Sequence, residues 1–146
     1  VTMFRDPKMI EVVAKHKPIC IVSHLSPKSS TIADAHKNPQ ATTIKEVKEE
    51  LLAKREELIT AGVPVKNIIL DPGIGFGKTM ELNEELLQFA KQVPDIGVMI
   101  GYSRKRFLGE HRMELEPNLE AGKIAMNSGA RYLRVHDVAG HKKLLD

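Results

Sequence analysis

The stretch IILDPGIGFGKT, residues 68–79, joins a short apolar segment to a glycine-rich loop. The apolar run at 68–70 predicts a buried strand that leads directly into Asp71 and Pro72. In sheets built from alternating strands and helices, ligands bind at the carboxyl ends of the strands. Asp71 is therefore placed to contact a ligand, although an acid beside Pro and Gly also commonly caps a turn.

The glycine loop is close to two nucleotide-binding motifs but matches neither of them. A phosphate-binding loop that ends in Gly-Lys-Thr at 77–79 needs a glycine at position 72, and Pro72 has no amide hydrogen to donate there. The dinucleotide motif Gly-x-Gly-x-x-Gly needs a third glycine where Lys78 stands. The loop therefore gives no support for binding of ATP or NAD.

Length and composition indicate one ordinary domain with a mild positive charge. The 146 residues are 42% hydrophobic, and 22 Lys and Arg against 19 Asp and Glu leave a net charge of +3. This charge suits a small anionic ligand, whereas two Tyr, four Phe and no Trp, without a clustered basic stripe, argue against nucleic-acid binding. The single Cys20 excludes a disulfide within the chain. With no apolar run of about 18 residues and no signal peptide, we expect a cytoplasmic protein without membrane contact.

Apolar periodicity and capping residues predict several helices and strands. One helix is expected to begin at Pro7 after the N-cap Asp6, and another after Thr43, which forms a capping box with Glu46 and precedes the C-cap Gly62. Further helices are expected at 82–93, 118–128 and 138–145, and strands at 19–22, 68–70, 96–102 and 132–137.

Residues 27–42, rich in Ser, Lys, Asn and Pro, predict a long loop between the first strand and the second helix. The predicted strands are short and apolar, as parallel strands covered on both faces are. Four such strand–helix units fit either a small doubly wound sheet or half of an eight-stranded barrel, because a complete barrel needs about 250 residues.

Polar or charged residues end each predicted strand. In chain order they are Ser23 and His24, Asp71, the group Ser103, Arg104 and Lys105, and finally Arg134 and His136. Parallel strands joined by helices place these ends on one rim, where cations would hold phosphate and a lone carboxylate would accept paired N–H donors from a heterocycle. Residues 103–106 are also explained by a solvated basic turn. Arg134 is expected inside a strand, where a buried guanidinium without a partner would be costly.

Three motifs in this order resemble the C-terminal motifs of the dihydropteroate synthase family. They are LDPGIGFGKT at 70–79, GYSRKRFLG at 101–109 and RVHDV at 134–138, and the resemblance covers essentially the whole chain. The family joins a pterin pyrophosphate to p-aminobenzoate on an eight-stranded barrel. The resemblance implies an α/β fold in which residues 1–146 are a partial pterin-binding domain, namely strands five to eight of a TIM-type (β/α)8 barrel. We expect the N-terminal half of that barrel to precede Val1.

The resemblance also implies a role for each matching residue. Asp71 would accept hydrogen bonds from the amino-pyrimidine edge of the pterin, and Lys105 would reach the pterin ring. Arg134 and His136 would bind the pyrophosphate and, with Lys105, would be the catalytic residues. The remaining substrate-binding residues would be Gly75, Phe76, Ser103 and Arg104 around the p-aminobenzoate site, together with Gly101 and Val135.

The implied reaction condenses 6-hydroxymethyl-7,8-dihydropterin pyrophosphate with p-aminobenzoate to give 7,8-dihydropteroate and pyrophosphate. The resemblance implies Mg2+ as the cofactor, with its Asn ligand in the N-terminal half, a homodimer built through the late helices, and a target of sulfonamides. Because the N-terminal half is expected to complete the barrel, we expect the chain alone to be inactive. One departure from the family pattern is the segment 22–25, Val-Ser-His-Leu, which stands where the family has a stretch like Met-His-Met.

Two other functions are compatible with parts of the sequence. Methyltransferases that act on methyltetrahydrofolate share the barrel and the pterin-binding acid, but they need no pyrophosphate clamp, so Arg104, Arg134 and His136 favour the synthase. A non-catalytic pterin-binding fragment is the other alternative.

Overall fold

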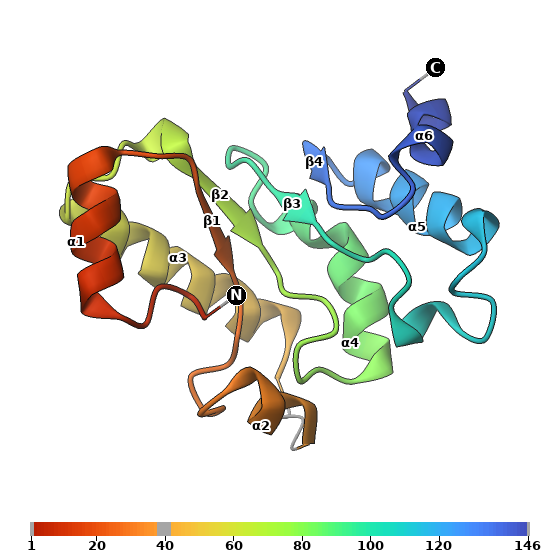
Figure 1. The fold of residues 1–146 in the computed structure, drawn as a ribbon, viewed down its shortest axis with the longest axis horizontal. Coiled ribbons are helices and arrows are strands. Elements are labelled where there is room, and N and C mark those ends of the chain that lie inside the picture. Colours follow the sequence, from red (N-terminus) through yellow and green to blue (C-terminus); the bar gives the residue numbers. More distant parts are fainter. Residues whose placement is uncertain (1, 38–41, 146) are drawn as a thin grey trace.

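The computed structural model describes residues 2–37 and 42–145, and its helices and strands alternate along the chain (Figure 1). The α-helices are α1 (Pro7–His16), α2 (Ile32–Lys37), α3 (Ile44–Thr60), α4 (Met80–Glu85), α5 (Leu115–Asn127) and α6 (Val138–His141). The 3₁₀ helices are η1 (Val65–Asn67), η2 (Leu86–Gln92), η3 (Arg106–Leu108) and η4 (Lys142–Leu144). The strands are β1 (Cys20–Ser23), β2 (Ile68–Asp71), β3 (Met99–Ile100) and β4 (Tyr132–Leu133).

The strands lie side by side in their order along the chain. β1 pairs with β2 and β3 pairs with β4, both in parallel. A parallel bridge between Leu70 and Val98 joins β2 to β3. The order of the described strands is therefore β1-β2-β3-β4. This order fits the wall of a barrel, whereas a doubly wound sheet reverses its strand order at a switch point.

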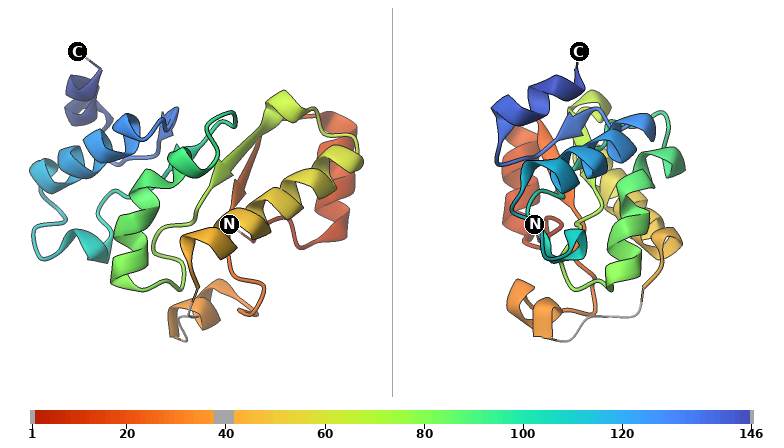
Figure 2. Two further views of the ribbon diagram at one scale, coloured as in Figure 1. Left: turned by 180° about the vertical axis from the view of Figure 1, so that it is seen from behind. Right: turned by 90° about the vertical axis from the view of Figure 1, so that its right-hand side faces the viewer.

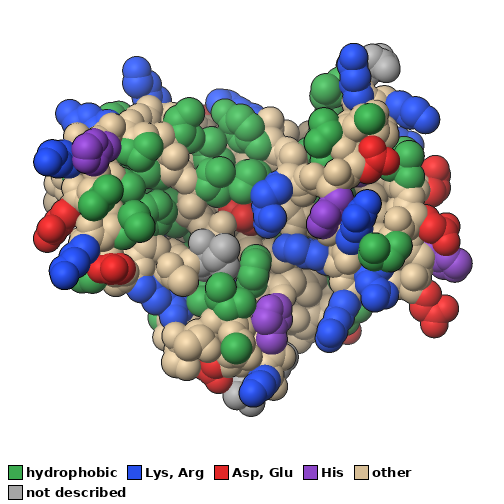
Figure 3. Space-filling model, viewed as in Figure 1, with side chains coloured by type: hydrophobic (Ala, Val, Ile, Leu, Met, Phe, Trp, Pro, Cys, Tyr) green, Lys and Arg blue, Asp and Glu red, His purple; other side chains and the backbone are tan. Residues whose placement is uncertain are grey.

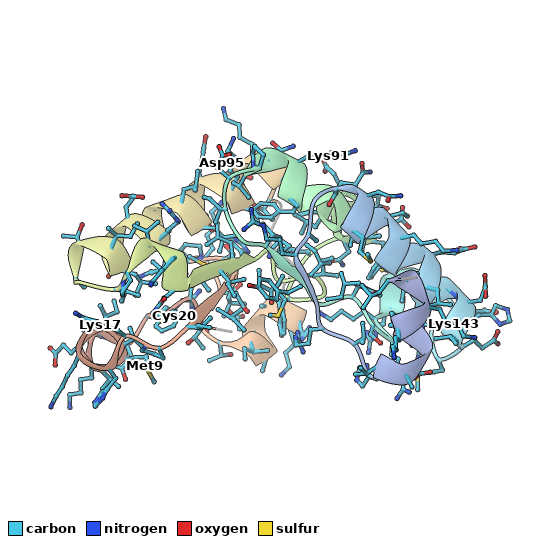
Figure 4. All side chains as sticks on the ribbon, turned by 90° about the horizontal axis from the view of Figure 1, so that it is seen from above. Met9, Lys17, Cys20, Lys91, Asp95 and Lys143 are labelled. Atoms are coloured by element: carbon cyan, nitrogen blue, oxygen red, sulfur yellow. The ribbon has the colours of Figure 1, made fainter. Side chains whose placement is uncertain are left out.

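Helices α3, α4 and α5 cover one face of the strands, as the views from the front and from behind show (Figures 1 and 2). Seen from above, Lys17 at the end of α1 and Lys143 in η4 lie at opposite ends of the molecule (Figure 4). In a (β/α)8 barrel the helices form the outer ring and the other face of the strands lines the interior. The arrangement is that of part of such a barrel.

The hydrophobic core lies between the strands and the helices that cover them. Leu51 of α3, Leu70 of β2 and Phe89 of η2 are completely buried. Burying one such Leu side chain contributes about 1.5–3 kcal/mol to folding. Of the described helices, none has the length and apolar content required to cross a membrane.

The predicted helix starts are confirmed where a capping residue marks them. The Asp6 side chain accepts a hydrogen bond from the Lys8 amide over 2.9 Å at the start of α1. At the start of α3, the Thr43 hydroxyl accepts from the Glu46 amide over 3.2 Å, and the Thr43 amide donates to Glu46 Oε2 over 2.8 Å. Gly62 follows the end of α3 with φ of 107°, a conformation that favours glycine.

Part of the loop predicted at 27–42 is helical. α2 begins after Thr31, whose hydroxyl accepts a hydrogen bond from the Asp34 amide over 3.0 Å. The pattern Thr-x-x-Asp is a capping signal, which an interpretation based on polar composition overlooks. Residues 38–41 of the predicted loop lie outside the described residues.

Two strands are shorter than predicted. The strand expected at 96–102 is reduced to β3, because the chain turns at Tyr102, whose carbonyl accepts from the Lys105 amide over 3.2 Å. The strand expected at 132–137 ends at Leu133. The side chains that follow these strands therefore lie on loops.

The later helices also differ from the predictions at their boundaries. The helix expected at 82–93 is α4 followed by η2, with a kink at Gln88 where φ is −99° and ψ is 15°. The helix expected at 118–128 begins three residues earlier, at Leu115. The helix expected at 138–145 is α6 followed by η4.

Candidate functional site

Polar side chains lie at the carboxyl end of each described strand. Ser23 closes β1, Asp71 closes β2, Ser103 follows β3 and Arg134 follows β4. Because neighbouring strands are parallel, these ends meet on one rim. Figure 3 shows Lys, Arg and His side chains gathered in the middle of one face, beside an acidic side chain.

Asp71 is buried, and two hydrogen bonds hold its carboxylate. The residue is 2% exposed. Its Oδ2 accepts from the Ser23 hydroxyl over 2.9 Å, and its Oδ1 accepts from the Gly73 amide over 2.8 Å. The carboxylate also interacts with the nearby ammonium groups of Lys78 and Lys105. Each carboxylate oxygen has more than one lone pair, so both can accept a further N–H donor from a ligand.

Burial lowers the pKa values of these two lysines. For Lys78, which is 8% exposed, burial lowers the pKa from 10.5 to about 7, with a further contribution from the charge of Lys105. For Lys105, burial and the charge of Arg134 lower the pKa to about 8. The charge of Asp71 opposes both shifts, but desolvation of the ammonium group is the larger effect. Both lysines therefore titrate near neutral pH.

Lys78 is a residue of the rim for which the sequence predicts no role. In the sequence it is only a mismatch to nucleotide-binding motifs, yet its side chain lies beside Asp71 at the rim. A lysine in a glycine-rich loop is usually exposed, so no local pattern indicates its burial.

The glycine loop places Phe76 next to Lys105. The Lys105 ammonium donates to the Ile74 carbonyl and lies 4.9 Å from the centre of the Phe76 ring, within the range of a cation–π contact. Gly75 has φ of 81°, and a Cβ atom there would lie 3.0 Å from Cδ of Lys105. Glycine at this position therefore leaves room for the lysine side chain.

Arg134 is exposed and lies over Gly101. A Cβ atom on Gly101 would lie 2.7 Å from Nη2 of Arg134, so the guanidinium rests directly against the glycine. The expectation that Arg134 is buried inside a strand was wrong. β4 ends at Leu133, and Arg134 lies on the exposed face of this segment with Tyr132, whereas Leu133 and Val135 pack against the core. The charge is accessible to a ligand at the rim.

Ser103 links the loops after β3 and β4. The Ser103 hydroxyl oxygen lies 3.0 Å from Nδ1 of His136 and accepts a hydrogen bond from the His136 amide over 3.3 Å. The neighbouring Arg104 has φ of 60°, and its amide donates to Asn118 Oδ1 of α5 over 2.9 Å, while its side chain is exposed. Val135 is half-buried and packs against the core. Ser103 and His136 thus form a pair, with Arg104 on its solvent side.

His24 connects the end of β1 to helix α3. It is fully buried, and its Nε2 lies 2.7 Å from Glu50 Oε2. Burial and the charges of Lys78 and Arg5 lower the pKa of His24 to about 3. The imidazole is therefore neutral, and its contact with Glu50 is a hydrogen bond rather than an ion pair. His24 was predicted among the residues of the rim. It lies at the end of β1, but it is buried and contacts Glu50, so it supports the rim and is not exposed to a ligand.

The rim combines one buried carboxylate with several cationic groups from other loops. A ligand that carries paired N–H donors at one end and a phosphate at the other matches this distribution of charge. Among residues 2–37 and 42–145, no three His, Cys, Asp or Glu side chains lie together in a group that could hold a metal ion.

Comparisons with known proteins agree with this geometry. The family model described as pterin binding enzyme matches residues 1–136. The chain is 33% identical over 147 residues to dihydropteroate synthase of Clostridium beijerinckii, and 31% identical over 150 residues to that of Haemophilus influenzae. The two matches cover 92% and 97% of this chain but 49% and 53% of the relatives. The chain thus spans about half the length of the curated relatives it matches.

Solved structures give the same result. Dihydropteroate synthase from Thermus thermophilus in complex with 6HMPPP matches with a TM-score of 0.88 and 33% identity, covering 99% of this chain and 60% of that one. The same enzyme in complex with 4-aminobenzoate matches with a TM-score of 0.87. The consecutive parallel strands, the polar rim and these likenesses show that the chain belongs to the family of pterin-binding enzymes, as a partial (β/α)8 barrel similar to about half of a dihydropteroate synthase.

Proposed function

We propose that this chain carries the C-terminal part of the substrate site of a dihydropteroate synthase. The reaction would join 6-hydroxymethyl-7,8-dihydropterin pyrophosphate to p-aminobenzoate and release pyrophosphate. Similarity to synthases along essentially the whole chain supports the proposal, as do the bound 6HMPPP and 4-aminobenzoate in the two Thermus structures.

The observation that carries the proposal is the position of Asp71 among cations from two other loops. The carboxylate is buried at the end of β2 and interacts with Lys78 and Lys105, and Lys105 in turn interacts with Arg134. A pterin ring presents an amino group and a ring N–H side by side, which suits a carboxylate that accepts two hydrogen bonds. Its pyrophosphate would extend toward Arg134 and His136.

The proposed chemistry requires the chain to stabilise a leaving group. The amine nitrogen of p-aminobenzoate forms a bond to the pterin methylene carbon while the bond from that carbon to oxygen breaks. The electron pair leaves with pyrophosphate, and the amine proton passes to solvent. Arg134, Lys105 and His136 would stabilise the negative charge that develops on the departing oxygen, which is the largest effect available to such a site.

The aromatic amine would lie beside the glycine loop. Phe76, next to Lys105, would offer its ring as one wall, Gly75 would leave space, and Ser103 and Arg104 would border the same region from the loop after β3. The Arg104 guanidinium, which is exposed, would pair with the carboxylate of p-aminobenzoate. This arrangement also explains how a sulfonamide would compete, since it presents an aniline ring of the same shape.

We further propose that residues outside this chain supply the other half of the barrel and the ligands for Mg2+. The chain covers 49% to 53% of two of its curated relatives, and the described strands have unpaired edges at β1 and β4. We also propose that the protein forms a homodimer through its late helices and that it is cytoplasmic. A groove of about 710 Å3 beside β4, α5 and α6, with Val138 and Leu145 exposed, offers a surface for such a contact.

Two measurements test the proposed function. The first compares turnover by the 146-residue chain with turnover by the intact protein, meaning the chain together with whatever sequence accompanies it in the cell. We expect pyrophosphate release that depends on p-aminobenzoate only from the intact protein, and full activity of the chain alone would contradict the half-barrel proposal.

The second measurement is a calorimetric titration of the intact protein with pyrophosphate. The synthase needs to bind this product, whereas a methyltransferase that uses methyltetrahydrofolate has no reason to bind it. Absence of pyrophosphate binding would therefore favour the methyltransferase. Tight binding of pterin and pyrophosphate without turnover would favour a non-catalytic binding protein.

A further inference from the structure

The glycine loop is bound from inside by a buried ammonium group. Lys78 donates to the Gly73 carbonyl over 2.9 Å and to the Phe76 carbonyl over 3.2 Å. These two carbonyls are three residues apart, so the loop curls around the side chain of the lysine that ends it. A buried carbonyl that loses its charged donor is left without a hydrogen-bond partner, which is unfavourable.

Other contacts fix the same loop from outside. The Gly75 amide donates to Asn83 Oδ1 over 2.7 Å, and the Ile74 carbonyl accepts from Lys105. Phe76 therefore has its carbonyl bound to Lys78 and its ring next to the Lys105 ammonium.

The loop has little room to take another shape. A Cβ atom on Gly73 would lie 2.1 Å from the His24 carbonyl oxygen, and one on Gly77 would lie 2.6 Å from the Ala35 carbonyl oxygen. The backbone thus passes close to His24, just after β1, on one side and to α2 on the other. Lys78 fills the space that remains between Gly73 and Phe76.

We propose that Lys78 is a positioning residue, which holds residues 73–77 in the shape that presents Phe76 to the aromatic amine and leaves Lys105 to the pterin. The identity of these ligands rests on the proposed function. The positioning itself rests on the hydrogen bonds of the loop. Lys78 does not need to touch either substrate.

The environment of Lys78 makes this positioning sensitive to pH. The charged and titratable groups around it are Asp71 of β2, Glu50 of α3, Lys105 of the loop after β3, and the neutral His24. With a pKa of about 7, the ammonium predominates below neutral pH and the amine predominates above it. In an opened loop Lys78 would be solvated and would keep its ordinary, higher pKa, so protonation favours opening and the loop should become tighter as the pH rises through 7.

The test compares Lys78→Met with Lys91→Met in the intact protein. Lys91 is an exposed lysine of η2 whose ammonium binds the Gln88 side chain, so its replacement controls for the loss of one positive charge. In Lys78→Met we expect faster hydrogen exchange of the amides of residues 73–77. We also expect the KM for p-aminobenzoate to rise by about tenfold, with kcat and the KM for the pterin substrate within about threefold, as loss of one charged hydrogen bond predicts.

Lys78→Arg provides the rescue, because it keeps a charged donor, and we expect it to recover part of the loss. If Lys78→Met exchanges and binds like the unmodified protein, the positioning role is wrong. If Lys78→Met does not fold, the unmodified protein still decides. Exchange of the amides of residues 73–77, corrected for its intrinsic pH dependence, must become slower between pH 6 and 8, and unchanged exchange would overturn the positioning role. If the loop responds as expected but no synthase activity is found, the positioning role stands and the proposed function fails.

Discussion

The position of Arg134 is open to a sharp test, because a single methyl group on its neighbour would displace it. In Gly101→Ala, the added Cβ would lie 2.7 Å from Nη2, 3.1 Å from Cζ and 3.1 Å from Nε of Arg134. The atoms it meets belong to the flexible end of an exposed side chain, so the guanidinium moves and the backbone stays. Gly101 does not have a positive φ, so alanine is compatible with its backbone.

The expected magnitudes separate binding from stability. Replacing a glycine by alanine at a compatible position stabilises a protein by about 0.4–1 kcal/mol, so the melting temperature should hold or rise slightly. Loss of one hydrogen bond between charged groups costs about 1.5–3 kcal/mol. The Kd for pyrophosphate in the intact protein should therefore rise by roughly 10- to 150-fold, which calorimetric titration measures directly.

Gly97→Ala is the matched control for this substitution. Its Cβ would lie 3.7 Å from Cγ1 of Ile69 and 3.8 Å from Cε2 of Tyr132, which are ordinary contacts, so binding should not change. Arg134→Ala should weaken binding as much as Gly101→Ala does, and the double variant should add less than about 0.5 kcal/mol. Unchanged pyrophosphate binding in Gly101→Ala, or a full additional loss in the double variant, would refute the assignment of Arg134.

Three further predictions concern buried titratable groups. As the pH falls from 6.5 toward 3, the unfolded chain takes up a proton at His24 before the folded one does, so stability is lost, by about 2 kcal/mol at pH 5. Urea denaturation at pH 5 and pH 7.5 measures this loss, and His24→Gln should remove it. His16→Gln, on the exposed side of α1, is the control and should leave the loss in place. Between pH 7 and 10.5, Lys78 keeps its proton in the unfolded chain but has released it in the folded protein. The free energy of unfolding should therefore rise with pH, by up to about 1.4 kcal/mol per pH unit. Lys78→Met should flatten that rise. Asp71→Asn should weaken pterin binding by roughly 10- to 150-fold in calorimetry, and a change below twofold would exclude Asp71 as the pterin acceptor.

The sequence allowed prediction of those parts of the fold that depend on local patterns. The caps Asp6 and Thr43 mark helix starts through short-range hydrogen bonds, so a reader of the sequence can find them. The placement of Asp71 at the rim follows from the general rule that parallel strands present their carboxyl ends together. Family membership followed from three motifs in order, and the comparisons confirm it.

The remaining features depend on how distant segments meet. Burial of Lys78 arises from the shape of the loop around it, since its partners are carbonyls, which every residue possesses. The exposure of Arg134 depends on which face of the segment 132–137 is left uncovered by the rest of the fold, and no property of that segment alone fixes this. Gly101 was named for its motif, whereas its actual contact with Arg134 joins two loops that are distant in sequence and requires both of them to be folded.

The consecutive order of the strands has a consequence for biosynthesis. Each new strand docks on the edge formed by the strand made just before it, and contacts such as Ser23 with Asp71 or Ser103 with His136 span 48 and 33 residues. These four strands can therefore be added one β/α unit at a time as the nascent chain leaves the ribosome, because each of the described pairings joins strands that are consecutive along the chain. At each stage the unpaired edge of the most recently made strand would be the surface that most needs protection from neighbouring chains on the same messenger RNA.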